Sequence, residues 1–272
     1  MSGLPMEGSE HRDCAKISGF ETIRRPDSVT VEKGLEISIS MPETGDYPLG
    51  ITMRSPGNDI ELVHGFLYSE GVISSKDDVI DLLVDGDLAV VHLDETSSFN
   101  TDFHSRSTTV NSSCGICGRS TIDDMLHMHP PPLSENVNID LEIISKSLEL
   151  MSSQQVLFSS TGGSHACASF SSTGELIKIF EDVGRHNAMD KLVGSYLIEG
   201  GFPICDEFVI VSGRASFELV HKALLAGFPI MIAIGAPSNI AIDMANENGM
   251  TLACFAKSES MTVYSAMRRI ET

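Results

Sequence analysis

Hydrophobic and polar residues follow different periods in the two halves of the chain. In the first part, short extended pieces dominate: Glu36–Ile39 alternates polar and apolar residues, and Leu88–Leu93 is rich in β-branched residues. A helix is predicted over residues 60–70 and ends at Gly71. Its expected apolar stripe comprises Ile60, Val63, His64 and Leu67. These elements predict a small α+β unit.

The second half alternates apolar strands with helices of roughly 10–15 residues, which is typical of a parallel or mixed sheet covered by helices. A helix is expected over residues 139–151. Strands are predicted to end near Phe180, over Phe208–Val211 and over Ile230–Ile234, and each runs into a glycine-containing junction before a helix. The chain is therefore expected to be α/β, with an N-terminal α+β domain over residues 1–110 and a C-terminal domain over residues 111–272.

The three junctions are candidates for one ligand site, because ligands bind outside the carboxyl ends of strands in open α/β sheets. The residues concerned are Gly184, Arg185, His186, Ser212, Gly213, Arg214 and Gly235. Arg185 and Arg214 would offer planar cations to a pyrophosphate, and His186 can titrate near neutral pH. The alternative is structural: Asp182 and Ser212 would cap helices, and the arginines would form ion pairs.

The net charge limits the partners that the chain can bind. The sequence has 18 basic and 38 acidic residues, a net charge of -20, which disfavours nucleic acid and anionic membranes. No apolar run approaches the roughly 18 residues of a membrane span, and the cysteines are too sparse for a disulfide scaffold. We therefore expect a cytoplasmic protein, in which an anionic ligand would need a local group of basic residues.

Cys114 and Cys117 form the only pair of cysteines at short spacing, in a segment that follows a polar linker over residues 95–113. Two thiols three residues apart can share a metal, a disulfide or a transferred sulfur atom. A zinc site would need further ligands, for which His127 and His129 are candidates. Flanking glycines and a nearby cation favour redox or sulfur chemistry over a structural role.

Two further residues have a structural interpretation beside the functional one. His165 follows a Gly-Gly turn and either faces the paired thiols or makes a structural hydrogen bond. Cys167 lies in an apolar stretch and is expected to be an inert core residue.

Several motifs, taken in order, resemble the formate dehydrogenase accessory sulfurtransferase (FdhD/NarQ) family. The motifs span most of the chain and comprise residues 53–56, 65–71, 113–118, 162–165, 181–191, 212–218 and 235–238. The resemblance implies a sulfurtransferase that moves sulfur from a cysteine desulfurase, through a persulfide on Cys114 with Cys117 as its partner thiol, to the molybdenum cofactor (bis-molybdopterin guanine dinucleotide). This delivery would be needed for formate dehydrogenase activity.

The same resemblance implies a fold, an assembly and a cofactor-binding stretch. The C-terminal domain is expected to be a cytidine-deaminase-like three-layer structure with a mixed sheet, and the protein a homodimer with no permanent metal. The cofactor-binding stretch corresponds to Phe255, Ala256, Lys257, Ser258, Glu259 and Ser260. Here the chain has Ser258, Glu259 and Ser260 where the family commonly offers a glycine and a second basic residue.

Two rival functions remain open at this point. A zinc-dependent hydrolase of the deaminase type would need a His-x-Glu segment and a Pro-Cys-x-x-Cys segment. The sequence has no His-x-Glu and has Ser113 where that proline would stand. The second rival is a chaperone that binds the molybdenum cofactor without moving sulfur.

Overall fold

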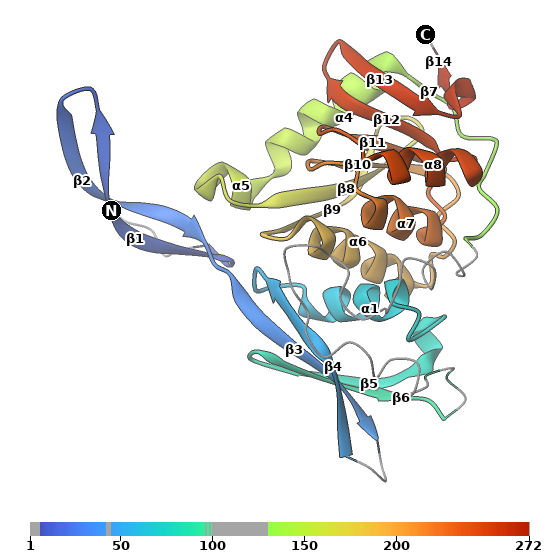
Figure 1. Cartoon of the computed structure of the whole chain (residues 1–272), viewed down its shortest axis with the longest axis horizontal. Coiled ribbons are helices and arrows are strands. Elements are labelled where there is room, and N and C mark those ends of the chain that lie inside the picture. The colour runs from blue at the N-terminus through green and yellow to red at the C-terminus, as the bar shows by residue number, and fades with distance from the viewer. Residues whose placement is uncertain (1–5, 42–44, 96, 98, 100–129, 272) are drawn as a thin grey trace.

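The computed structural model describes residues 6–41, 45–95, 97, 99 and 130–271. The described residues form a mixed α/β protein with two larger sheets. Helices that cover the two sheets pack against each other at the centre of the molecule (Figure 1). Among the helices described, none combines the length and the apolar character required to cross a bilayer.

The larger sheet lies in the C-terminal half and has the strand order β13-β12-β11-β10-β8-β9. Its strands are β8 (His165–Ser171), β9 (Leu176–Asp182), β10 (Glu207–Val211), β11 (Ile230–Ala233), β12 (Thr251–Lys257) and β13 (Ser260–Ser265). β10, β11 and β12 run parallel, whereas β8 runs antiparallel to both of its neighbours, β9 and β10. The carboxyl ends of β9 to β12 therefore share one edge of the sheet with the start of β8.

Helices cover both faces of this sheet (Figure 1). One face is covered by α6 (Arg185–Glu199), α7 (Phe217–Ala226) and α8 (Asn239–Glu247), and the other by α4 (Leu141–Gln154). On α4, Ile144 and Met151 lie on one side of the helix and are fully buried against Phe170 and its neighbours. The predicted alternation of strands and helices in this half is confirmed.

Short elements complete the C-terminal half. They are α5 (Val156–Thr161), the paired strands β7 (Ile139–Asp140) and β14 (Ile270–Glu271), and the 3-10 turn η2 (Met267–Arg269). Asp140 accepts a hydrogen bond from the backbone N–H of Ile143 at 2.7 Å, which fixes the start of α4.

The second sheet has the order β4-β3-β6-β5 and is covered by α1 (Asp59–Ser69). Its strands are β3 (Lys33–Met41), β4 (Gly45–Arg54), β5 (Val79–Asp85) and β6 (Leu88–Leu93), and the turn η1 (Lys76–Asp78) precedes β5. The predicted helix is confirmed, but its predicted stripe is wrong at Ile60, which is 49% exposed. Leu62 takes a place in the buried face instead, because the helix also packs against α6 and not only on its own sheet.

The two sheets are joined where α1 crosses α6, and glycines permit the close approach of the two helices. A Cβ on Gly65 would lie 1.9 Å from the carbonyl oxygen of Asp190, and one on Gly194 would lie 1.9 Å from that of Glu61. Only glycine leaves room for backbones at this separation. The predicted domain boundary at residues 110 and 111 lies outside the described residues, and the division into two domains stays a prediction.

A two-stranded β-ribbon extends from the rest of the molecule (Figure 1). It consists of β1 (Ser9–Ser18) and β2 (Glu21–Thr30), which pair only with each other among the described residues. Its base is fixed to α5, where the hydroxyls of Thr30 and Thr161 are 2.7 Å apart.

Candidate functional site

Three of the predicted segments meet in a main-chain ladder beyond the ends of β10 and β11. The N–H of Gly235 donates to the carbonyl of Gly213 at 3.0 Å, and the N–H of Phe255 donates to the carbonyl of Gly235 at 3.1 Å. This Gly213–Gly235–Phe255 ladder continues the pairing past the last residues of β10 and β11, alongside the second half of β12. The junctions are therefore neighbours in space, as their positions in the sequence predicted.

Arg185 lies over the ladder at Gly213. A Cβ on Gly213 would be 3.4 Å from Cδ of Arg185 and 3.6 Å from Nδ1 of His165, so both side chains lie in van der Waals range of this position. The Nε of Arg185 is buried and has no hydrogen-bond partner among the described residues. A buried donor without an acceptor is costly, and the oxygen of an anionic ligand would satisfy it.

The structural alternative for the two arginines finds no support in the part of the chain that is described. Neither Arg185 nor Arg214 forms an ion pair there. Arg214 is exposed and directly follows the ladder residue Gly213. Both guanidinium groups therefore remain available to an anion at this edge of the sheet.

His165 joins the same site from the start of β8. Its Nδ1 is 3.4 Å from the Oγ of Ser212, and that hydroxyl accepts a hydrogen bond from the N–H of Ala166 at 2.9 Å. Ser212 therefore holds β8 against the junction and does not cap α7. Burial, followed by the nearby charges of Arg185 and His186, lowers the pKa of His165, so its imidazole is neutral at pH 7. The Gly-Gly turn before His165 was the signal for this residue in the sequence.

His186 is turned away from the ladder and towards the start of α7. It is buried, with its Nε2 3.7 Å from Oε2 of Glu218 and 3.4 Å from Oγ of Ser216. Burial would raise the pKa of Glu218, but the adjacent His186 and hydrogen bonds from its surroundings lower that pKa to about 2. The geometry makes His186 a link between α6 and α7.

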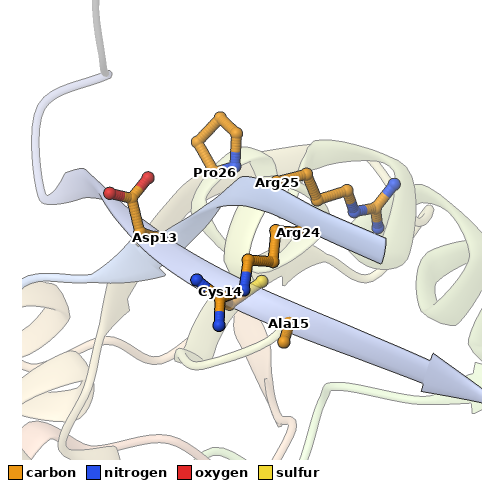
Figure 2. Close-up of a pocket in the computed structure, with 6 residues that line it drawn as sticks. All are labelled: Asp13, Cys14, Ala15, Arg24, Arg25 and Pro26. Atoms are coloured by element: carbon orange, nitrogen blue, oxygen red, sulfur yellow. The ribbon is translucent and has the colours of Figure 1, made fainter. Parts of the chain in front are cut away.

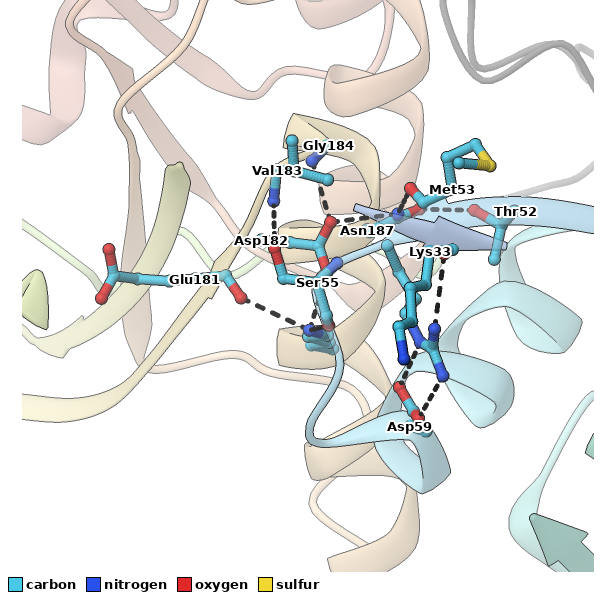
Figure 3. Close-up of polar contacts among 12 residues, drawn as sticks. Lys33, Thr52, Met53, Ser55, Asp59, Glu181, Asp182, Val183, Gly184 and Asn187 are labelled. Atoms are coloured by element: carbon cyan, nitrogen blue, oxygen red, sulfur yellow. Dashed lines mark hydrogen bonds and ion pairs between the residues drawn. The ribbon is translucent and has the colours of Figure 1, made fainter. Parts of the chain in front are cut away.

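Asp182, at the end of β9, organises a buried polar network rather than a ligand site (Figure 3). Its carboxylate accepts hydrogen bonds from the N–H of Gly184 at 2.8 Å and of Ser55 at 3.1 Å, and it pairs with Lys191 at 2.7 Å. Ser55 in turn accepts from the N–H of Val183 at 3.0 Å. The structural interpretation of Asp182 is the one that these contacts support.

The rest of this network fixes the N-terminal sheet to α6 (Figure 3). The amide of Asn187 donates to the carbonyl of Met53 at 2.6 Å and accepts from the hydroxyl of Thr52 at 3.0 Å. The buried Arg54 is held by Asp59 through two hydrogen bonds of 3.1 and 3.0 Å. Much of the motif over residues 181–191 thus joins the two halves of the molecule and leaves Arg185 for the site.

The stretch over residues 255–260 lies at the end of the ladder. Phe255 has a positive φ of 54° at an irregularity in the pairing of β12 and β13, and it is 45% exposed. Positive φ is uncommon outside glycine and is often found at functional sites. Lys257 and Ser258 line a shallow hollow of about 410 Å³ between this stretch and α4. Ala256 is buried, and Glu259 and Ser260 are exposed at the turn into β13.

The predicted carriers Cys114 and Cys117 lie outside the described residues, as do His127 and His129. Of the cysteines that are described, Cys167 and Cys254 are buried. Burial raises the pKa of both thiols, in Cys254 to about 12, so they stay protonated and unreactive at neutral pH. The prediction of an inert Cys167 is confirmed.

Comparisons with known proteins point to one family over nearly the whole chain. The model of the FdhD/NarQ family matches residues 34–271. A sulfur carrier protein FdhD from Streptomyces avermitilis is 38% identical, with 96% of this chain and 95% of that protein covered. The protein of the same name from Thermoplasma acidophilum is 43% identical, covering 93% of this chain and 89% of that protein.

A solved structure has the same fold. The crystal structure of a candidate formate dehydrogenase accessory protein from Desulfotalea psychrophila aligns with a TM-score of 0.80. The alignment covers 97% of this chain and all of that chain, at 23% sequence identity.

Proposed function

Because the chain belongs to the FdhD/NarQ family, we propose that it is a sulfur carrier in the maturation of formate dehydrogenase, with Cys114 as the carrying residue. The observation that carries this proposal is the agreement with sulfur carrier proteins along nearly the full length of both chains. The donor would be a cysteine desulfurase and the client a formate dehydrogenase, in the cytoplasm.

The substrate that receives the sulfur would be the molybdenum cofactor, bis-molybdopterin guanine dinucleotide. The site at the sheet edge fits the phosphates of such a molecule, because Arg185 has a buried donor without a partner and Gly213 leaves space beside it. Arg214 adds an exposed cation next to the ladder. Phe255 offers an exposed ring that could stack on a guanine base.

Sulfur loading is an exchange between a thiolate and a persulfide. The Cys114 thiolate attacks the outer sulfur of the donor's persulfide, the donor's sulfur–sulfur bond breaks, and the donor leaves as a thiolate. Cys114 then carries one additional sulfur atom.

Release of the carried sulfur atom to the cofactor uses Cys117 as a second thiol. The Cys117 thiolate attacks the inner sulfur of the Cys114 persulfide, so the outer sulfur leaves at the sulfide level for the cofactor while the two cysteines form a disulfide. A cellular thiol reductant then restores both thiols. Cys117 is in this scheme the resolving residue.

We also infer a cytidine-deaminase-like arrangement of the C-terminal half and a homodimer. The mixed sheet, in which β8 and β13 run antiparallel to the other four strands and helices cover both faces, supports the first inference. The second inference comes from the family alone.

Mass spectrometry tests the proposal directly. After incubation of the full chain with a cysteine desulfurase and cysteine, the peptide that contains Cys114 should gain one sulfur atom, which dithiothreitol should remove. Cys114→Ala should abolish both the added sulfur and the activation of formate dehydrogenase, and Cys205→Ala serves as the control. A Cys114→Ala protein that still activates formate dehydrogenase would favour the chaperone, and stoichiometric zinc bound through both paired thiols would favour the hydrolase.

A further inference from the structure

The β-ribbon is a part of the molecule that the proposed sulfur transfer does not use. From His11 to Asp27 every residue is at least partly exposed, and in the described part of the chain the ribbon is fixed to the body at its base, by the contact of β2 with α5. A two-stranded ribbon without further packing is marginally stable in water. An exposed ribbon of this length is therefore expected to gain contacts from another surface.

The tip of the ribbon is apolar. Phe20 in the turn is fully exposed, and Ile17 and Ile23 beside it are 72% and 57% exposed. Ile17 is paired with Thr22 and Ile23 with Lys16, so the two isoleucines point to opposite faces of the ribbon. A tip that is apolar on both faces suits insertion against a partner surface more than exposure to water.

Behind the tip, the ribbon presents basic side chains on both faces. Arg24 is paired with Ala15 and Arg25 with Cys14, and these residues line a hollow of about 490 Å³ (Figure 2). Asp13 contributes the only carboxylate of that lining among the described residues. The hollow therefore favours an acidic surface.

The charge of the chain indicates which acidic surface this is. Residues 9–30 contain four basic and four acidic residues, so the whole net charge of -20 falls on the remainder of the chain. Two such bodies repel each other when they approach directly. A neutral ribbon with exposed arginines can contact the acidic body of a second copy, and twofold symmetry would form this contact twice.

We propose that the β-ribbon is an arm that docks on the acidic body of a second copy of this chain. Phe20 is the apolar anchor of the contact, and Arg24 and Arg25 are its charged part. The proposal deepens the inferred homodimer, on which it rests, by naming the surface that forms it. It does not depend on sulfur transfer, because loading of Cys114 is measured separately.

Light scattering coupled to size-exclusion chromatography of the full chain tests the arm over a dilution series. The wild type should elute as a dimer, at twice the chain mass. Phe20→Ser and the double variant Arg24→Glu/Arg25→Glu should each raise the dimer dissociation constant at least about tenfold, because both replace exposed side chains at the contact.

Ile80→Ser, at a 66% exposed position on β5, is the matched control and should leave the dimer unchanged. A far-UV circular dichroism spectrum like that of the wild type shows that the Phe20→Ser protein is folded. A wild type that is monomeric at every concentration, or a dimer that is insensitive to both ribbon variants, overturns the proposal. A monomeric wild type whose Phe20→Ser variant loses formate dehydrogenase activation also overturns it, and assigns the ribbon to a different protein.

Discussion

Arg185 has a buried Nε without a hydrogen-bond partner in the described part of the chain, which supports the proposed role in ligand binding over a structural role. Its Nε has no acceptor among the described residues, whereas the neighbouring Asp182 and Asn187 are fully engaged in the polar network. Removing the guanidinium should therefore cost ligand binding and leave folding nearly unaffected.

The corresponding prediction concerns Arg185→Gln. We expect the dissociation constant for guanosine diphosphate, measured by isothermal titration calorimetry, to rise at least about tenfold, since a charged hydrogen bond contributes roughly 1.5–3 kcal/mol. Lys146→Gln, which removes the same charge from an exposed position on α4, should bind like the wild type. If the Arg185→Gln variant binds guanosine diphosphate as tightly as the wild type does, the phosphates of the ligand do not bind at Arg185.

A second prediction at this scale follows from Glu218, whose folded pKa of about 2 lies below its ordinary value of 4.5. A lowered folded pKa stabilises the protein above pH 4.5, and that stability is lost as the pH falls towards 2. In urea unfolding between these pH values, the wild type should therefore lose about 2 kcal/mol more than Glu218→Gln, after allowance for solvent screening. Parallel pH curves for the two proteins would contradict the assigned pair with His186.

The site residues could be predicted from the sequence only in part. Arg185, Gly213 and Gly235 were predictable because each follows an apolar strand and precedes a helix. The orientation of His186 was not, since its partner Glu218 lies on a different helix and only the packing of α6 on α7 brings them together. The predicted thiols lie outside the described residues and stay predictions.

At the scale of elements, the crossing of α1 and α6 determines how the two halves of the molecule are joined. The Gly65 and Gly194 positions have no space for a Cβ, and the contact is between backbones. Such a contact cannot adapt by changing a rotamer, so both helices would have to separate.

Gly194→Ala tests this crossing. We expect a loss of about 3 kcal/mol in the free energy of unfolding, although alanine favours helix formation, because overpacking outweighs helix propensity at this site. Ser152→Ala, at an exposed position on α4, should change stability by less than about 0.5 kcal/mol. A stabilised Gly194→Ala protein would mean that the helices are farther apart than described.

The pair of Lys191 and Asp182 offers an independent test of the same junction. Both side chains are almost completely buried, so Lys191→Met should leave an uncompensated carboxylate and cost about 3–5 kcal/mol in chemical denaturation. Adding Asp182→Asn to Lys191→Met should recover part of that loss. A double variant whose loss equals the sum of the losses of the two single variants would contradict the energetic coupling of Lys191 and Asp182.

Elements with a strong hydrophobic period were predictable, and those without it were not. α7 and the parallel strands follow from runs of apolar residues that the fold buries. The ribbon strands β1 and β2 carry charges and Pro26 in place of an alternating pattern, because no face of the ribbon is buried in one copy. The exposure of Ile60 was not predictable for a related reason. α1 packs on α6 as well as on its own sheet, and the local hydrophobic period does not reveal this second contact.

At the scale of the whole molecule, the net charge of -20 opposes the compact state as well as association of two bodies. Salt screens this repulsion, with a Debye length of about 10 Å at 0.1 M. For the Phe20→Ser protein, at a concentration at which light scattering shows it to be monomeric, we therefore expect the melting temperature to rise by roughly 2–5 °C between low and moderate salt. A falling melting temperature would show that attractive ion pairs dominate instead.

The Gly213–Gly235–Phe255 ladder has a consequence for how members of this fold can diverge. A binding surface built from peptide groups keeps its shape when side chains change, because each link is a main-chain hydrogen bond. In the proposed site, selectivity between ligands would then reside in side chains beside the ladder, such as those of Arg185 and Arg214. Single substitutions at such positions can change the specificity, while the main-chain hydrogen bonds of the ladder stay the same.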